Sequence, residues 1–392
     1  MIIAVIGVVL LAAAHSVAQF TPDQVRSVLV EYVGFTEADL AAMDKGEIVV
    51  KPVRTGSKQD IAVFGIVRNT RLPQFTMEDF RASLSQKRNK EMSAKGSFSD
   101  PPQIADLSAL TLEDEDLEEL RKCSAGDCDI NMSANWIRRF NSEVDWNAAD
   151  RRERATELFR AMLLDYATQY AAKGAGALGE LVNRYKTVDL TRTHRELLSA
   201  IVPLNTFAPA LSGYLSEFPA SNGTVVKNEM HWSSMDFGLN PTVTLTHAAV
   251  YTNAVEGNQQ HFVVTRQFYS SRYLDASVSL SMLLRVPDGD IVDSYIVFTD
   301  RSRSDALDGL FGGVAKGVVE NEAVARVTTV LKNSELRLLS TSSRQNEPQT
   351  EPETSSGGVV DVLASRILLI AGAAAVLAFI IFAVMRRRNA KS

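Results

Sequence analysis

The chain has 392 residues, of which 45% are hydrophobic and 22% charged, and its formal net charge is −6. This composition is typical of a globular protein. The negative charge and the lack of a basic face argue against nucleic-acid binding, because phosphate recognition needs clustered lysine and arginine. Between Gln19 and about Ser340 lie about 320 residues, which is enough for one large domain or two ordinary ones.

The chain begins with an apolar run, MIIAVIGVVLLAAA, that is too short to span a bilayer comfortably. Ser16 and Ala18 follow it in the small-x-small pattern of a signal-peptidase site. We therefore predict a signal peptide over residues 1-18. No lysine or arginine precedes the apolar run, so an uncleaved N-terminal anchor is the alternative.

Residues 19-100 predict a helix, a β-hairpin and a second helix. The first helix covers Thr21–Leu40, because a Thr-Pro pair starts it and apolar residues recur at helical spacing. Two Val- and Ile-rich strands, Glu47–Val53 and Asp60–Arg68, flank a turn-forming segment and indicate the hairpin. Thr76–Lys90 has a Thr cap and early acidic residues, which indicate the second helix.

Residues 101-218 predict a helical insertion or subdomain, with helices over Thr111–Lys122, Ser133–Val144 and Asp150–Lys173. The first of these contains the acidic run EDEDLEEL, which lacks the glycine turn and alternating oxygen ligands of an EF-hand. Acidic residues at the start of a helix and basic ones at its end also suit the helix dipole. We therefore interpret this run as a solvated helix rather than a calcium site.

The chain has two cysteines, Cys123 and Cys128, separated by four residues that include a glycine. This spacing fits neither the redox motif C-x-x-C nor haem attachment. An oxidising compartment outside the cytoplasm favours a bonded pair, and free or reactive thiols are the alternative. We predict a structural disulfide that closes a small loop.

Residues 219-339 predict an antiparallel meander followed by a long helix. Period-two alternation and short turns indicate four strands, at Thr242–Thr252, His261–Tyr273, Ser277–Val286 and Ile291–Thr299. An amphipathic pattern then predicts a helix over Asp305–Leu338.

The end of the chain predicts a membrane tether. Residues 340-360 are polar and lack a hydrophobic core pattern, so we expect a disordered linker. Ile367–Met385 contains no charge and spans about 28 Å as a helix, close to the thickness of the bilayer core. Residues 386-392 begin with three arginines, which mark the cytoplasmic side. We expect a single-pass protein that contacts the lipid bilayer through Ile367–Met385, with its body outside the cytoplasm.

The predicted order of elements resembles that of START-like, helix-grip domains, in which a curved sheet wraps a long final helix. The resemblance covers about Gly46–Leu338, with residues 101-218 as an insertion. It implies an α+β fold with an antiparallel sheet, a covering C-terminal helix and an internal cavity for a lipid-like ligand.

Three segments, KCSAGDCDINMSA, MHWSSMDFGLNPTVTLTH and FTDRSRSDALDGLFGG, also resemble those of uncharacterised exported bacterial membrane-anchored proteins. This resemblance implies a bacterial envelope location. It implies no catalytic residues.

The candidate ligand-binding residues are aromatic or basic side chains at strand ends, with one histidine on an apolar strand face. They are His247, Tyr269, Arg272, Tyr273, Arg301 and Arg303. Arginines of this kind either bind an anionic headgroup or pair internally with Asp275 and Asp305. The histidine alternatively has its nitrogens satisfied in the core.

We find no catalytic motif, no cofactor motif and no metal site. The spacing of His231, His247 and His261 permits a zinc site without indicating one. Our leading hypothesis is a membrane-tethered domain that binds a small apolar or amphipathic ligand. The alternatives are a non-catalytic scaffold or protein-interaction module of the envelope and an unrecognised hydrolase.

Overall fold

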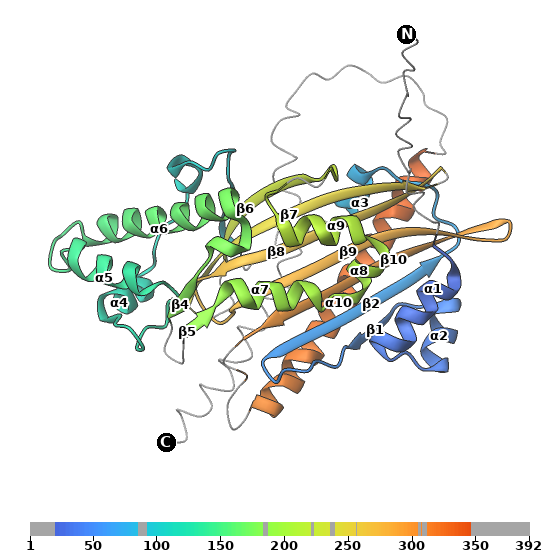
Figure 1. Ribbon diagram of the computed structural model, residues 1–392, viewed down its shortest axis with the longest axis horizontal. Helices are drawn as coiled ribbons and strands as arrows, with labels where there is room; N and C mark the ends of the chain where they lie inside the picture. The colour runs from blue at the N-terminus through green and yellow to red at the C-terminus, as the bar shows by residue number, and fades with distance from the viewer. Residues whose placement is uncertain are drawn as a thin grey trace, which may run out of the picture.

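A computed structural model describes residues 20–84, 92–182, 187–220, 223–235, 240–255, 257–304, 307 and 312–345. The fold is α+β, as predicted, with one large antiparallel sheet and several helices (Figure 1). The predicted signal peptide (1-18), transmembrane segment (367-385) and basic tail (386-392) lie outside the described residues. Within the described ranges, no helix is both long and apolar enough to cross a membrane.

The large sheet has eight strands in the order β1-β2-β10-β9-β8-β7-β6-β3. Four of them, β7 to β10, form the predicted meander and pair antiparallel in sequence order. The strand bounds are β1 Val49–Pro52, β2 Asp60–Asn69, β3 Met92–Ser97, β6 Lys227–Met235, β7 Thr242–Val255, β8 Asn258–Ser270, β9 Ala276–Asp288 and β10 Ile291–Arg303.

The predicted N-terminal hairpin is present as β1 and β2, and its second strand joins the meander. β2 pairs antiparallel with β10 along its whole length, from Asn69 opposite Ser294 to Asp60 opposite Arg303. This contact places the second strand of the N-terminal hairpin beside the last strand of the chain.

Two strands of the sheet, β3 and β6, were not predicted. β3 has the sequence MSAKGS, whose small and polar residues give little strand signal. It is an edge strand that pairs with β6, and Gly96 lies opposite Trp232. A Cβ atom at Gly96 would lie 2.4 Å from the indole nitrogen of Trp232, so only glycine leaves room for this ring. Tertiary packing therefore decides this pairing.

The predicted helix Thr21–Leu40 is divided in the structure. Its parts are α1 Pro22–Ser27, a π-helical turn η1 Val28–Val33 and α2 Glu37–Asp44. Gly34 ends the first part in the left-handed region, at φ 80°, which glycine adopts without steric cost. Thr36 then caps α2 by accepting a hydrogen bond from the backbone N–H of Asp39.

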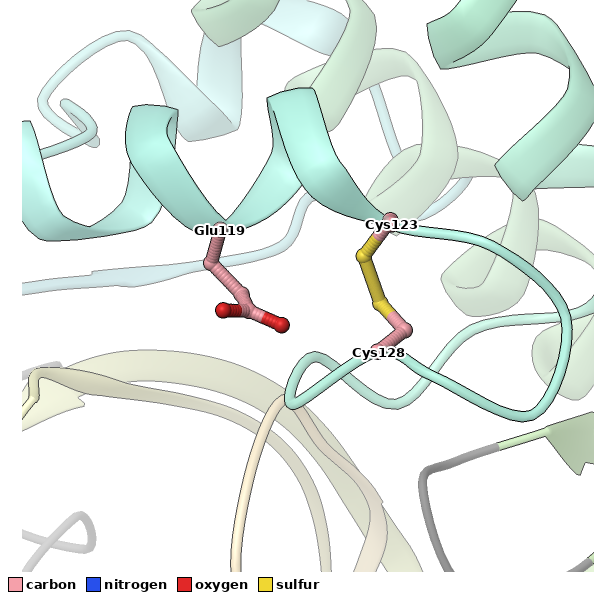
Figure 2. Close-up of side chains that lie close together, drawn as sticks. All are labelled: Glu119, Cys123 and Cys128. Atoms are coloured by element: carbon pink, nitrogen blue, oxygen red, sulfur yellow. A yellow bond between two sulfur atoms is a disulfide. The ribbon is translucent and has the colours of Figure 1, made fainter.

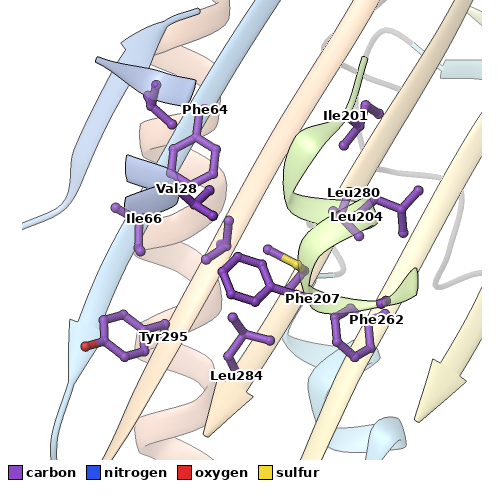
Figure 3. Close-up of a cluster of buried hydrophobic side chains, with 14 of the residues drawn as sticks. Val28, Phe64, Ile66, Ile201, Leu204, Phe207, Phe262, Leu280, Leu284 and Tyr295 are labelled. Carbon is purple, nitrogen blue, oxygen red and sulfur yellow. The ribbon is translucent and has the colours of Figure 1, made fainter. Parts of the chain in front are cut away.

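One face of the sheet packs against these N-terminal helices and against α7 Leu190–Ser199, α8 Val202–Phe207 and α9 Pro209–Glu217. Figure 3 shows Val28 and Phe207 inserted among strand residues such as Leu284 and Phe262. In Figure 1 the helices α7 to α9 lie in front of the sheet. Part of the predicted helical insertion therefore belongs to the layer that covers the sheet.

The rest of that segment forms a second cluster at one end of the sheet (Figure 1). It consists of η2 Ile104–Leu107, α4 Asp114–Lys122, α5 Ala134–Glu143, α6 Arg151–Lys173, η3 Gly174–Ala177 and the small hairpin β4 Glu180–Val182 and β5 Thr187–Asp189. Its apolar residues pack around Tyr269, Phe268 and Trp232 of the sheet.

The opposite face of the sheet packs against α3 Met77–Leu84 and α10 Gly312–Gln345. The predicted second helix ends at Leu84 in the described part, since residues 85–91 lie outside it. The predicted disordered linker from residue 340 is wrong for its first residues, because α10 continues to Gln345. Leu338, at the end of the predicted helix, is fully buried. The last turns of α10 continue beyond this buried residue to Gln345.

Gly65 sets how closely α10 approaches the sheet. A Cβ atom at this position of β2 would lie 2.6 Å from Val327 Cγ1 and 2.7 Å from Leu331 Cδ1. Both side chains are buried in the α10 layer. A methyl group at residue 65 therefore has to displace these two buried side chains or the helix that carries them.

We predict that Gly65→Ala lowers the free energy of unfolding by about 1–3 kcal/mol, the usual cost of overpacking. The measurement is denaturant unfolding of the full chain. Gly56→Ala is the matched control, because no atom lies within 4 Å of the added Cβ. Equal stabilities for the two variants would contradict this account of the α10 contact.

Candidate functional site

The described part of the molecule contains a pocket of about 460 Å³ between the β3–β6 edge of the sheet and the helices α6 and α9. This volume falls in the range of small-molecule sites. Its wall combines aromatic and apolar side chains with polar ones. The lining residues are Ser97, Phe98, Ser99, Asp100, Ala171, Tyr214, Phe218, Pro219, Asn228, Glu229, Met230 and His231.

The outer wall is built on the edge strand and the loop that follows it. Trp232 passes against Gly96 and donates a hydrogen bond from its indole N–H to the Asp106 carbonyl, at 2.8 Å. The Asp106 carboxylate in turn accepts hydrogen bonds from the backbone N–H and the hydroxyl of Ser99. These contacts fix the loop from Phe98 to Asp100 against the sheet.

The inner wall depends on a close approach between the end of α6 and the end of α9. Gly174 has φ 64°, and a Cβ atom there would lie 1.9 Å from the carbonyl oxygen of Phe218. Glycine is thus required at this position. The contact holds the Phe218 ring 4.5 Å from the His247 ring and 5.4 Å from the Tyr170 ring, measured between centroids.

A hydrogen-bond network lies directly behind this inner wall. The buried His247 ring forms two hydrogen bonds. Its Nδ1 lies 2.8 Å from Tyr170 Oη, and its Nε2 lies 2.9 Å from Asn228 Oδ1. Burial, helped by the positive charge of Arg266, lowers the pKa of His247 to about 3. The imidazole is therefore neutral at physiological pH, with one donor and one acceptor nitrogen.

The polar wall of the pocket is centred on Glu229, whose carboxylate lies close to several basic side chains. Arg81 and Lys227 each lie 2.9 Å from its carboxylate oxygens, and His231 Nε2 lies 3.5 Å away. Burial would raise the pKa of Glu229, but the contacts with His231 and Lys227, together with the charge of Arg81, lower it to about 2. This carboxylate is ionised and compensated.

Of the predicted ligand-binding residues, His247 lies beside the pocket, and three others lie together near α4. Tyr269 is buried, stacks on Tyr166 and donates a hydrogen bond to the Asn131 carbonyl. Arg272 is buried and forms an ion pair with Asp116 of α4. Tyr273 has φ 67°, and its carbonyl accepts a hydrogen bond from Ser304.

Arg301 and Arg303 lie at the end of β10 and both bind the buried carboxylate of Asp60. Arg301 Nη2 lies 2.9 Å from Asp60 Oδ2, and Arg303 Nε lies 2.6 Å from Asp60 Oδ1. Arg303 also pairs with Glu196 of α7. The internal pairing of these two arginines therefore involves Asp60 and Glu196. The structure thus separates the six predicted residues into three places.

The predicted disulfide is confirmed, because Cys123 and Cys128 are bonded with their Cα atoms 4.5 Å apart. Figure 2 shows Glu119 of α4 beside them, and its carboxylate accepts a hydrogen bond from the Asp129 N–H. Among the described residues, this is the single group with the spacing of metal ligands. The two sulfur atoms of this group are bonded to each other, so we assign the group a structural role.

The three histidines considered for zinc do not converge. His231 faces Glu229 and Ser97, whereas His247 points to the opposite face of the sheet. His261 lies near α3 and contacts the Phe75 carbonyl at 2.7 Å.

The pocket residues that sequence reasoning missed include Tyr214, Phe218 and Asn228. Tyr214 lies in α9, Phe218 directly follows this helix and Asn228 lies in β6, and no periodic pattern marks them. The one available signal is the pair of aromatic residues, Tyr214 and Phe218, that precedes Pro219, because proline is common just after the end of a helix.

The chain matches no known family model, and comparison with curated proteins and with solved structures gives no match. The function is therefore proposed from the geometry of the molecule.

We predict that Glu229 stabilises the fold above its unfolded pKa, near 4.5, and that this contribution is lost as pH falls toward 2. The reason is that its folded-state pKa lies below the unfolded value. Glu229→Gln should therefore lower stability at pH 7 and approach the wild type near pH 2. Unfolding curves at several pH values measure this. Glu217→Gln, at an exposed position of α9, is the control, and an equal loss in both variants would contradict the prediction.

Proposed function

We propose that this protein binds a small amphipathic molecule in the pocket between β3, β6, α6 and α9. The observation that carries this proposal is a site of about 460 Å³ with an aromatic wall on one side and hydrogen-bonding groups on the other. Such sites bury most of a small ligand against apolar surface, and a few polar groups orient it. The apolar part of the ligand lies against Phe218 and Tyr214.

The START-like, helix-grip interpretation of the fold is part of this proposal. It is supported by the antiparallel sheet and by α10, which covers one face of it. The ligand position differs from that expected of a helix-grip domain. The described contact of α10 with β2 is filled by Val327 and Leu331, which close over Gly65. We therefore assign the ligand to the other end of the sheet, beside the helices α6 and α9.

We also propose that the folded part is tethered to a membrane, outside the cytoplasm. The support comes from the two apolar ends of the sequence and the basic run after Met385. The Cys123–Cys128 disulfide is consistent with an oxidising compartment.

The test of ligand binding is a substitution that fills the pocket. Ala171 of α6 lines the pocket, and Ala172 beside it is exposed. We predict that native mass spectrometry of the full-length protein detects a co-purifying small molecule in the wild type and in Ala172→Phe but not in Ala171→Phe. The phenylalanine ring at residue 171 occupies the ligand volume. Equal ligand occupancy in both variants, or a wild type without ligand, would argue against this site.

The test of the tether is the accessibility of the two ends. A reporter fused after Ser392 should resist protease added to intact spheroplasts, whereas the folded part is digested. Permeabilised cells provide the control, in which both parts are digested. Digestion of the reporter in intact spheroplasts would overturn the proposed topology.

A further inference from the structure

A buried arginine lies behind the pocket, and no carboxylate in the described part of the chain pairs with it. Arg266 of β8 is 2% exposed. It donates hydrogen bonds to the Leu215 carbonyl at 2.9 Å and to Tyr170 Oη at 3.4 Å. Among the described residues, it forms no ion pair. Burying an uncompensated charge is costly, so neighbouring dipoles must orient their negative ends toward it.

This arginine fixes the direction of the hydrogen-bond network that leads to the pocket. A guanidinium can only donate, so Tyr170 Oη accepts from Arg266 and turns its own proton toward His247 Nδ1. The neutral His247 then carries its proton on Nε2 and donates to Asn228 Oδ1. This is the arrangement that leaves the buried Tyr170 hydroxyl proton with an acceptor.

The network ends in the pocket wall. The amide of Asn228 donates from Nδ2 to Tyr214 Oη, at 2.6 Å. Tyr214 is 6% exposed and lines the pocket, and its own hydroxyl proton meets no acceptor in the described part of the chain. Hydrogen bonds that run in one direction polarise each other, so the guanidinium charge strengthens this last donor.

We infer that the Tyr214 hydroxyl binds an acceptor oxygen of the ligand and that the preferred ligand is an amphipathic carboxylate. The inference rests on the proposed function, since it concerns the same pocket. Two acidic residues, Glu229 and Asp100, also line the pocket. Glu229 is compensated by Arg81 and Lys227, and Asp100 is exposed to solvent, which screens its charge.

The ligand thus lies with its carboxylate on Tyr214 and its apolar body along Phe218. This orientation places the charge at the end of the polarised network. An amine at the same position would face the positive end of each dipole in the network. Selection between the two ligand classes is therefore electrostatic.

The test uses a matched pair of water-soluble probes, 3-phenylpropionate and 3-phenylpropylamine, with the full-length protein in nanodiscs. Ligand-observed NMR titration gives both affinities, and empty nanodiscs give the background. We expect the wild type to bind the carboxylate more tightly than the amine. Tyr214→Phe should weaken carboxylate binding about tenfold or more, the effect of losing one hydrogen bond to a charged group. The amine affinity should change little.

Tyr251→Phe is the matched control, because this tyrosine of β7 does not line the pocket. An equal effect of Tyr214→Phe on both probes would overturn the inference, as would a wild type that prefers the amine. The wild-type preference needs no variant, so the inference can be tested even if Tyr214→Phe fails to fold. Binding that survives Ala171→Phe would instead overturn the proposed site, and failure of both probes to bind would do the same.

Discussion

The pairing of β2 with β10 is the contact on which the whole arrangement depends. It joins the N-terminal hairpin to the last strand of a meander that begins more than 170 residues later in the chain. Asp60 at the start of β2 binds Arg301 and Arg303 at the end of β10. The side chains of all three residues are mostly buried. A buried carboxylate between two guanidinium groups has its charge and its lone pairs satisfied, so this end of the sheet is fixed in register.

The two faces of the sheet differ in how they are covered. One face packs against the α1–α2 and α7–α9 layer through large apolar side chains, as Figure 3 shows. The face toward α10 also carries buried polar groups, among which Ser277, Ser279 and Ser302 donate to Asp300. Burial raises the pKa of Asp300, and the three hydroxyl groups oppose this shift. A polar cluster of this kind is tolerated inside a protein because its members satisfy one another.

The pocket forms where these layers end. β6 and β3 extend the sheet beyond the meander, and α6 and α9 reach that edge from different helical clusters. Glycine at 96 and at 174 lets Trp232 and Phe218 approach closely, so the walls are held by packing on both sides. The same packing buries His247 and Arg266 behind the wall and gives the network its direction. The proposed ligand chemistry is thus a consequence of how the edge of the sheet is closed.

Local patterns in the sequence determined the elements that carry strong periodicity. The alternation of β7 to β10, the Val- and Ile-rich hairpin and the cysteine spacing each follow from interactions between near neighbours, and the structure confirms them. The strands β3 and β6 and the pocket depend on residues that meet only after folding. His247 was singled out because a histidine stood on an apolar strand face, but its partners Tyr170 and Asn228 lie 77 and 19 residues away. Only the tertiary structure brings such groups together, because a hydrogen-bond network is specified by distance in space, and separation along the chain does not encode it.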